Sequence, residues 1–160
     1  MSKEQVDIAI VGGGIGGSAL ATVMSRSGFN CLVLEKTTEF EDRTSGEWIA
    51  PWGVQEAERL GLLANVLSAR GHYRRRHVSF SPFRSESEAN AATLDFETVA
   101  GGRPLAQRHP DLCQALVDAA TAAGASTNRN VSEVEVELGK QPTVRHIFDG
   151  AGHQIRDDFE

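Results

Sequence analysis

The sequence lacks several features that assign a chain to common protein classes. No apolar run in its 160 residues approaches the length of about 20 that a membrane-spanning helix needs. Its two cysteines, Cys31 and Cys113, have no CxxC spacing, so we expect both to be small buried core residues. The histidines form neither an HExxH motif nor a Cys/His cluster, and GxSxG is absent. A metal site and hydrolase chemistry are therefore both disfavoured.

The sequence also has fewer basic than acidic residues. It contains 16 Lys and Arg residues and 22 Asp and Glu residues, which gives a formal net charge of −6 and a pI near 5.4. An acidic balance disfavours nucleic acids and anionic membranes as partners. The first residues, MSKEQVD, lead directly into an apolar run without a signal peptide, so the expected compartment is the cytoplasm. The length and the 40% hydrophobic content are those of one ordinary soluble domain.

Residues 6–36, by contrast, have a clear pattern of apolar runs and glycines. They read VDIAIVGGGIGGSALATVMSRSGFNCLVLEK. A short apolar run at Ile8–Val11 and another at Cys31–Leu34 are typical of parallel strands that are buried on both faces. Between them, glycines are followed by a helical pattern from about Ile15 to Ser27, with Gly28 suited to end it. This order is that of a dinucleotide-binding βαβ unit.

The glycines of this stretch have the G-x-G-x-x-G spacing. Gly12 permits a tight turn, Gly14 lets a pyrophosphate approach the backbone, and Gly17 lets the helix pack closely against the strands. The N-terminus of the following helix points its N–H groups and partial positive charge at the phosphates. Gly13 and Ile15 lie in the same turn, and we expect them to contact the cofactor as well.

An acidic residue ends the second strand. Glu35 lies roughly 20 residues beyond the glycines, where a carboxylate accepts hydrogen bonds from ribose hydroxyls. A carboxylate there also argues against the 2′-phosphate of NADP, although Lys36 follows it. A tight strand-to-helix turn without a ligand is the structural alternative to nucleotide binding.

The next segment, residues 37–52, is polar and rich in turn residues. Arg43 either contacts a phosphate or ribityl hydroxyl or is a solvated loop arginine. Trp48 and Trp52 either pack the loop or form a wall for a flavin ring or substrate. Residues 53–67 have helical spacing that is broken near Gly61.

The middle of the chain predicts strands at residues 78–80 and 93–99, with an exposed loop at residues 81–92 between them. The basic run at residues 74–77 is typical of a solvated face, with anion binding as the alternative. Arg108 precedes a clear helix that Gly124 ends, and it is either a surface residue or near an anion. Three strand-like segments follow, with a hairpin turn at Asp149-Gly150; they are residues 131–138, 143–148 and 153–155.

Together these residues resemble the class A FAD-dependent monooxygenases, the para-hydroxybenzoate hydroxylase-like branch of the FAD-dependent oxidoreductases. The resemblance covers nearly the whole chain, and the later motifs are more specific than the first two. Four motifs carry it, namely VGGGIGGSALA at residues 11–21, VLEK at residues 33–36, R-x-x-G-x-x-x-x-P-x-G-V at residues 43–54 and R-x-x-x-L-x-x-x-L at residues 108–116.

The resemblance implies an α/β fold of the Rossmann-like FAD/NAD(P)-binding type, a parallel sheet with helices and antiparallel β additions. Residues 1–160 would be a partial FAD-binding domain, with residues 72–107 the start of an inserted substrate-domain β-region. Arg43 and Arg108 match family arginines along the ribityl-pyrophosphate part of FAD, and Val131 matches the residue beside the adenine. The implied cofactor-binding residues are thus Gly12, Gly13, Gly14, Ile15, Gly17, Glu35, Lys36, Arg43, Arg108 and Val131.

In such enzymes NAD(P)H reduces FAD, and oxygen then forms a flavin C4a-hydroperoxide that hydroxylates a small organic substrate. The cofactor carries the chemistry, and the sequence assigns no catalytic residue. Family members are usually much longer and have a later GD motif, whereas Asp149-Gly150 has a hairpin context. We therefore expect a truncated product or fragment.

Two other readings stay open. One is a non-catalytic nucleotide-binding module that a partner chain completes, and the other is an NAD-dependent dehydrogenase. The tyrosine Tyr73 is followed four residues later by His77, so the Tyr-x-x-x-Lys motif of many dehydrogenases is missing. The sequence does not determine the substrate, the choice between NADH and NADPH, or the oligomeric state. It also does not distinguish hydroxylation from halogenation or reduction.

Overall fold

The computed structural model describes residues 3–42, 48–140, 142–148 and 157–159. The chain divides into two compact units. Unit 1 comprises Met1–Asp42 and Pro110–Glu160, and unit 2 comprises Arg43–His109. The fold is α/β with a parallel sheet, helices and antiparallel additions, as predicted.

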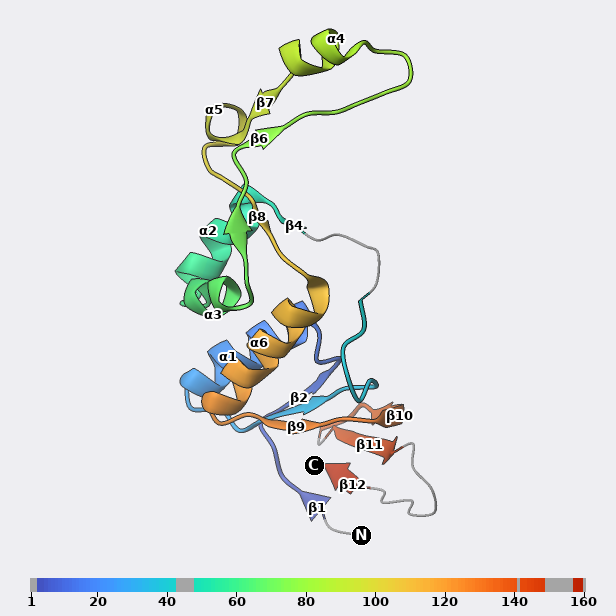
Figure 1. Cartoon of the computed structure of the whole chain (residues 1–160). Helices are drawn as coiled ribbons and strands as arrows, with labels where there is room; N and C mark the ends of the chain where they lie inside the picture. Colours follow the sequence, from blue (N-terminus) through green and yellow to red (C-terminus); the bar gives the residue numbers. More distant parts are fainter. Residues whose placement is uncertain (1–2, 43–47, 141, 149–156, 160) are drawn as a thin grey trace. The chain divides into compact units, whose positions relative to one another are not determined.

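Unit 1 is built on a three-stranded parallel sheet in the order β2-β3-β9. Its strands are β2 (Ile8–Val11), β3 (Cys31–Leu34) and β9 (Ser126–Asn128). Helices α1 (Ile15–Arg26) and α6 (His109–Ala122) lie side by side on one face of this sheet (Figure 1). The predicted strand–helix–strand order of residues 8–34 is confirmed, and Gly28, with φ +92°, follows the end of α1.

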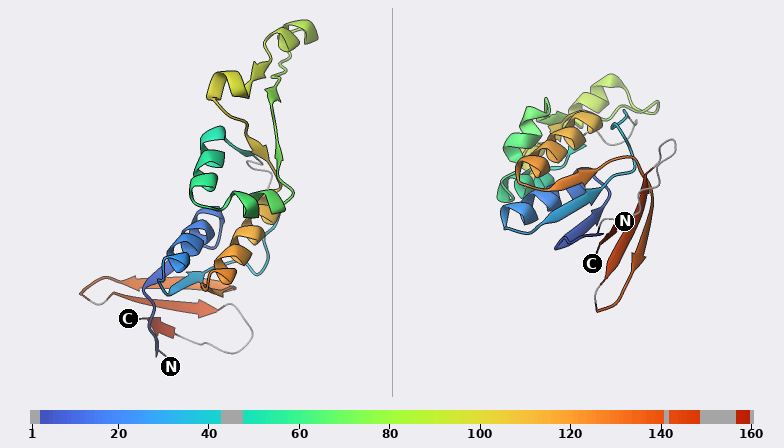
Figure 2. Two further views of the ribbon diagram at one scale, coloured as in Figure 1. Left: turned by 90° about the vertical axis from the view of Figure 1, so that its left-hand side faces the viewer. Right: turned by 90° about the horizontal axis from the view of Figure 1, so that it is seen from below.

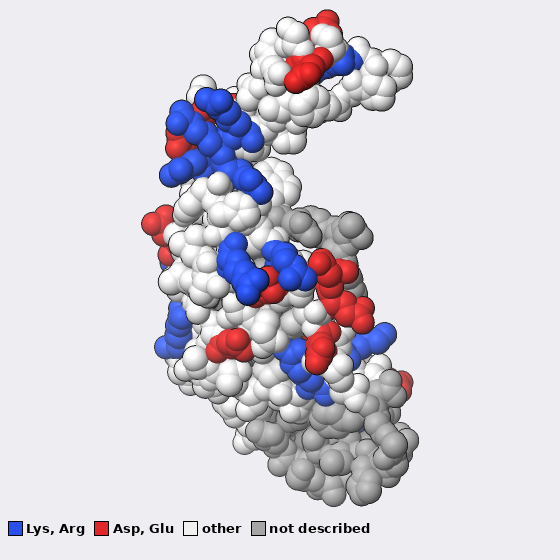
Figure 3. Space-filling model, in the orientation of Figure 1, with Lys and Arg blue, Asp and Glu red and all other residues white. Residues whose placement is uncertain are grey.

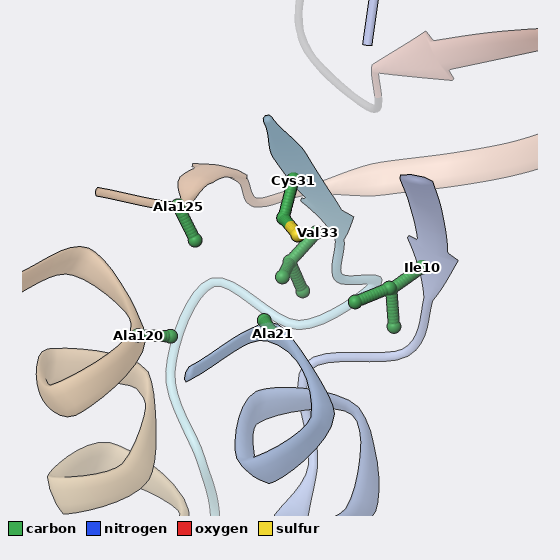
Figure 4. Packing of buried hydrophobic residues seen from close by; sticks show 6 residues of the cluster. All are labelled: Ile10, Ala21, Cys31, Val33, Ala120 and Ala125. Carbon is green, nitrogen blue, oxygen red and sulfur yellow. The ribbon is translucent and has the colours of Figure 1, made fainter. Parts of the chain in front are cut away.

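The central strand β3 is buried on both faces, which explains its continuous apolar sequence. Cys31 and Val33 point toward the helices, where they pack with residues of β2, α1 and α6 (Figure 4). Both cysteines are free and buried, as predicted. The cluster consists of Ile10, Ala21, Cys31, Val33, Ala120 and Ala125.

A second sheet covers the other face of β3. Leu32 and Leu34 pack there against Val131 at the start of β10. Both views of Figure 2 show β10 and β11 on the side of the parallel sheet opposite α1 and α6. The order of this four-stranded sheet is β1-β12-β11-β10. Its strands are β1 (Lys3–Glu4), β10 (Val131–Glu137), β11 (Thr143–Phe148) and β12 (Asp157–Phe159).

Unit 2 consists of short helices and strands. Its three-stranded antiparallel sheet has the order β4-β8-β5, from β4 (Trp48–Ile49), β8 (Leu105–Ala106) and β5 (His72–Tyr73). A two-stranded pair joins β6 (Arg76–His77) and β7 (Leu94–Asp95). The helices are α2 (Pro51–Arg59), α3 (Leu63–Ser68), α4 (Glu86–Ala91) and α5 (Phe96–Ala100). The predicted break near Gly61 is confirmed, since this residue has φ +67° between α2 and α3.

Three predictions for unit 2 were wrong. The strand expected at residues 78–80 is displaced to β6, and the loop expected at residues 81–92 contains α4. The strand expected at residues 93–99 stops after Asp95. There, the Asp95 carboxylate accepts a hydrogen bond from the N–H of Glu97 at 3.0 Å and caps α5. An N-terminal cap of this kind favours helix over strand.

The structure also contains a parallel strand that was not predicted. The parallel strand β9 was missed because residues 126–128 read STN, which has no apolar run.

Trp48 and Trp52 are 51% and 73% exposed, so neither ring is packed into a core. The predicted strand at residues 153–155 and the turn at Asp149-Gly150 lie outside the described residues. In the part of the chain that the structure describes, no helix has the length and apolar character to cross a membrane.

Candidate functional site at the glycine loop

The turn between β2 and α1 depends on two glycines that contact each other. Gly12 has φ +102°, a conformation that L side chains rarely adopt, and its N–H donates to the carbonyl of Leu34 at 2.8 Å. A Cβ at Gly17 would lie 1.9 Å from the Gly12 carbonyl oxygen. Position 17 therefore has to be glycine for α1 to pack this closely against the strand, as the motif predicted.

Hydroxyl groups fix the helix to the loop. The Ser18 hydroxyl donates to the Gly13 carbonyl at 2.7 Å, and the Thr22 hydroxyl donates to the Ser18 carbonyl at 2.7 Å. Both side chains are fully buried. The Ser18 bond holds the first turn of α1 against the glycine loop, whereas the Thr22 bond lies within α1 itself.

No contact within the described residues requires glycine at position 14. It is the N-cap of α1, and among the described residues no side chain forms a capping hydrogen bond there. A Cβ at Gly14 would meet no described atom within 4 Å. Among the residues that the structure describes, the space beside the first turn of α1 is thus open, and such a helix N-terminus attracts anions. This geometry fits the pyrophosphate of a dinucleotide.

Glu35 connects the end of β3 to this loop. Its Oε2 accepts a hydrogen bond from the Gly13 N–H at 2.6 Å, and its Oε1 accepts from the Thr37 N–H and hydroxyl, each at 2.8 Å. Burial raises the pKa of Glu35, but the donors of Thr37 and Gly13, together with Arg129, outweigh burial and hold this pKa below its ordinary value. The group is therefore a carboxylate near neutral pH. A carboxylate has about four acceptor positions, so these bonds leave room for a further donor.

The segment between β9 and β10 forms hydrogen bonds with the backbone of Glu35. The Glu35 N–H donates to the Asn128 carbonyl at 2.8 Å, and the Val131 N–H donates to the Glu35 carbonyl at 3.0 Å. Asn130, with φ +65°, makes the bend between them. The structure thus brings Val131 next to Glu35, although the two residues are far apart in the sequence.

Arg129 is a residue of this region that the sequence reasoning missed. Its guanidinium donates to the Thr38 carbonyl at 2.9 Å and to the Gln114 side chain at 3.0 Å. It also lies over the Phe40 ring, 4.7 Å from the ring centroid. Arg129 therefore fixes the loop that follows Glu35. A lone arginine between two strands has no spacing pattern that could have identified it.

Cys113 packs behind the first turn of α1. Burial raises the pKa of its thiol, and the nearby Glu35 carboxylate raises it further, while the Ile15 N–H acts in the opposite direction. The side chain is completely buried. A buried thiol with a raised pKa is inert, so Cys113 is part of the support for the loop.

The remaining predicted site residues are not all in this cluster. Lys36 is exposed next to Glu35. Arg108 belongs to unit 2, where it is exposed between β8 and α6. Arg43 lies outside the described residues. Within the described part, no group of three or more His, Cys, Asp or Glu residues is placed to hold a metal ion.

Comparisons with known proteins agree with this geometry. Residues 5–159 match the family described as FAD binding domain. Squalene epoxidase Erg1 of Schizosaccharomyces pombe is 36% identical over 73 residues, which are 46% of this chain and 16% of that protein. The 3-amino-4-hydroxybenzoate 2-monooxygenase PtmB3 of Streptomyces platensis is 40% identical over 62 residues, which are 39% of this chain and 16% of that protein.

A solved structure shows the same fold. The crystal structure of p-nitrophenol 4-monooxygenase PnpA from Pseudomonas putida DLL-E4 superposes with a TM-score of 0.77 at 16% identity. The superposition covers 99% of this chain and 40% of that one. The chain therefore spans less than half the length of each of these proteins.

Proposed function

We propose that this chain, which belongs to the FAD binding domain family, is the cofactor-binding portion of a flavin-dependent monooxygenase that hydroxylates a small organic substrate. Its cofactor is FAD. Relatives that carry monooxygenase or epoxidase in their names support the reaction class. The reductant in this proposal is NADH or NADPH.

The observation that carries the proposal is the open position at Gly14. Close packing explains Gly17, since a Cβ there would meet the Gly12 carbonyl at 1.9 Å. At Gly14 a Cβ would meet no described atom within 4 Å. Glycine at position 14, the N-cap of α1 without a capping side chain, instead fits a pyrophosphate that approaches the first turn of the helix.

The other assignments follow from positions around this turn. Gly12, Gly13 and Ile15 would line the pyrophosphate site with Gly14 and Gly17. The Glu35 carboxylate would accept a hydrogen bond from the adenosine ribose, and Val131, beside it in the structure, would lie next to the adenine. Lys36, Arg43 and Arg108 complete the proposed set, with the two arginines along the ribityl-pyrophosphate part.

The protein's own part in the reaction is to bind and orient. Bound FAD would supply the redox chemistry of the reaction. The loop is held by hydrogen bonds from Ser18 and to Glu35, both of which involve the backbone of Gly13. Such a preformed cradle lowers the cost of ordering the site on binding. We further propose that residues 72–107 of unit 2 are the start of the substrate-binding β-region.

FAD uptake tests this function directly. We expect the purified chain, when titrated with FAD, to quench flavin fluorescence with a stoichiometry of one and to retain a yellow colour after gel filtration. NADH added without flavin should give no comparable binding. A colourless protein that takes up neither compound would refute the proposal.

Two variants test the proposed contact between Glu35 and the adenosine ribose. Glu35→Ala removes the ribose acceptor, so we expect it to weaken FAD binding about tenfold or more, as for a lost charge-assisted hydrogen bond. Lys36→Ala, at the exposed neighbouring position, should weaken binding less than threefold, or by under about 0.7 kcal/mol. Circular dichroism spectra of both variants would control for folding, and equal losses of affinity would contradict the assignment.

A further inference from the structure

The middle of unit 2 forms an arm with almost no core of its own. The arm comprises residues 76–95, which form β6, a loop, α4 and β7. The structure describes all of these residues, and among them only Ala89 is buried. A two-stranded pair is marginally stable by itself in water, and a small element has little apolar surface to bury. A partner that covers the arm would therefore stabilise it.

A hydrogen-bonded turn in this arm presents phenylalanine to solvent. The Arg84 N–H donates to the Ser81 carbonyl at 3.1 Å, and the Phe83 N–H donates to the Ser81 hydroxyl at 3.3 Å. Pro82 occupies the second position of this turn, where its fixed φ is favourable. Phe83 at the next position is 95% exposed, and Phe80, just before the turn, is 69% exposed. Apolar side chains that are concentrated in this way mark an interaction site.

A groove where β6 and β7 meet the rest of unit 2 has matching chemistry. Its volume is about 570 Å³, which is within the range of about 300–1,000 Å³ that is typical of ligand pockets. Its apolar lining includes Trp48, Val78, Leu94 and Phe96. The ring centroids of Trp48 and Phe96 lie 5.8 Å apart, and Trp48 is 51% exposed. Aromatic side chains in a concave site favour an inserted aromatic ring.

The charges of these two surfaces are opposite. Arg74 and Arg76 line the groove, and no carboxylate is among the described residues that line it. For both arginines, no ion-pair partner is found in the part of the chain that the structure describes. The turn is followed by α4, whose first turn has the exposed residues Glu86 and Glu88 beside one basic neighbour, Arg84. Figure 3 shows basic side chains gathered over β6 and α5, and acidic ones on α4.

We propose that the arm docks on a second copy of this chain, with Phe80 and Phe83 of each copy in the groove of the other. Glu86 then lies near Arg74 and Arg76 of the second copy. Because each copy has both surfaces, the contact is reciprocal and two copies close it. A convex apolar turn also fits a membrane interface, but anionic lipids repel the glutamates of α4. The inference goes beyond the proposed function, since the proposed FAD site lies in unit 1.

Sedimentation equilibrium of the flavin-free chain tests the proposal. We expect a monomer–dimer equilibrium with a dissociation constant of about 10 μM. Phe83→Ser removes the inserted ring and should raise this constant about tenfold or more. Phe29→Ser is the matched control, because Phe29 is 44% exposed in unit 1, outside the arm. We expect it to change the dissociation constant less than about twofold.

Charge reversal tests how the two copies are oriented. Glu86→Arg and Arg74→Glu should each raise the dissociation constant about tenfold, because each places like charges together. The chain that has both substitutions again has opposite charges across the contact. Its dissociation constant should return to within about threefold of the original value. A loss that came from misfolding would not be recovered in this way.

Four results would overturn the proposal. They are a monomer at concentrations up to about 0.5 mM, a dimer that Phe83→Ser leaves unchanged, a double variant that does not recover, and assemblies larger than a dimer. Flotation with vesicles of phosphatidylcholine and phosphatidylglycerol tests the lipid alternative. Vesicle binding that Phe83→Ser abolishes would assign the turn to a membrane surface and would also overturn the proposal.

Discussion

At the residue scale, the glycines of the first loop differ in what a side chain would meet. The Gly17 position faces the Gly12 carbonyl, whereas the Gly14 and Gly16 positions face open space. The G-x-G-x-x-G pattern predicts that glycines are needed but does not tell a packing requirement from a ligand requirement. That distinction depends on which backbone atom lies opposite each Cα, and only the folded chain supplies it.

Alanine substitutions should separate the two requirements. Gly17→Ala forces α1 away from the loop, and we expect it to reduce the free energy of unfolding by about 1–3 kcal/mol. Gly14→Ala should cost less than about 1 kcal/mol, the difference between glycine and alanine at an N-cap, but lower FAD affinity about tenfold or more. Urea unfolding and FAD titration provide the two measurements.

Gly16→Ala is the control for this pair. Position 16 is exposed in the first turn of α1, and alanine there should leave FAD binding unchanged and stabilise the helix by up to about 1 kcal/mol. If Gly14→Ala retained full FAD affinity, the open space beside α1 would not be the pyrophosphate site.

Glu35 gives a pH-dependent prediction at the same scale. Its folded-state pKa lies below the ordinary value of 4.5, so its carboxylate stabilises the fold above that value. This contribution is lost as the pH falls through the lowered pKa. We expect Glu35→Gln to cost about 1–3 kcal/mol near neutral pH, and the difference from the unmodified chain should shrink below pH 4.5.

Urea midpoints measured between pH 3 and pH 7 would check this expectation. Glu39→Gln, at an exposed position of the following loop, removes the same charge without a buried hydrogen bond and is the control. A difference between Glu35→Gln and the unmodified chain that stayed constant over the whole range would show that protonation of Glu35 is not linked to folding.

At the element scale, α4 shows how a short helix can be hidden in a polar sequence. Residues 86–91 have no apolar stripe, so the reading of residues 81–92 as a loop followed from composition. The structure instead has a capping box, in which the Ser85 hydroxyl accepts from the Glu88 N–H at 3.3 Å and Glu88 accepts from the Ser85 N–H at 2.8 Å. The S-x-x-E spacing of Ser85 and Glu88 is a sequence signature of a helix N-terminus, so it could have predicted α4.

Removing this cap should affect α4 alone. We expect Ser85→Ala to destabilise the helix locally by about 1 kcal/mol, which corresponds to amide exchange about fivefold faster over residues 86–91. Ser87→Ala makes the same chemical change inside the helix and should not accelerate exchange. Hydrogen-exchange mass spectrometry reports both, and unchanged exchange in Ser85→Ala would mean that the cap does not stabilise α4.

Elements with apolar periodicity were predicted more accurately than those without it. The strands at residues 8–11 and 31–34 and the stop of α1 before Gly28 were predicted because burial and turn chemistry agree there. Strand β9 and the short strands of unit 2 have little apolar periodicity. Whether these residues form strands depends on pairing with segments that are distant in the sequence. Local propensity contains no information about such partners.

At the scale of the whole molecule, the first and last parts of the chain form unit 1 and the middle forms unit 2. The continuous motif at residues 6–36 predicted the α/β class and a dinucleotide, and the family resemblance that includes the later motifs at residues 43–54 and 108–116 narrowed the dinucleotide to FAD. The sequence did not predict the role of Arg129. This side chain contacts Thr38, Phe40 and Gln114, whose approach to Arg129 is a tertiary event.

The closure around Glu35 also has a consequence for the order of folding. Strands β2 and β3 are joined by α1 and can assemble locally, whereas Leu32 pairs with Ser126 across a stretch that includes all of unit 2. Joining distant segments carries a loop-closure entropy cost and is slow compared with local assembly. The bonds of Glu35 to Asn128 and Val131 therefore form late, after synthesis has passed the whole of unit 2. During synthesis, the glycine loop would exist before the contacts of Glu35 with Asn128 and Val131 are complete.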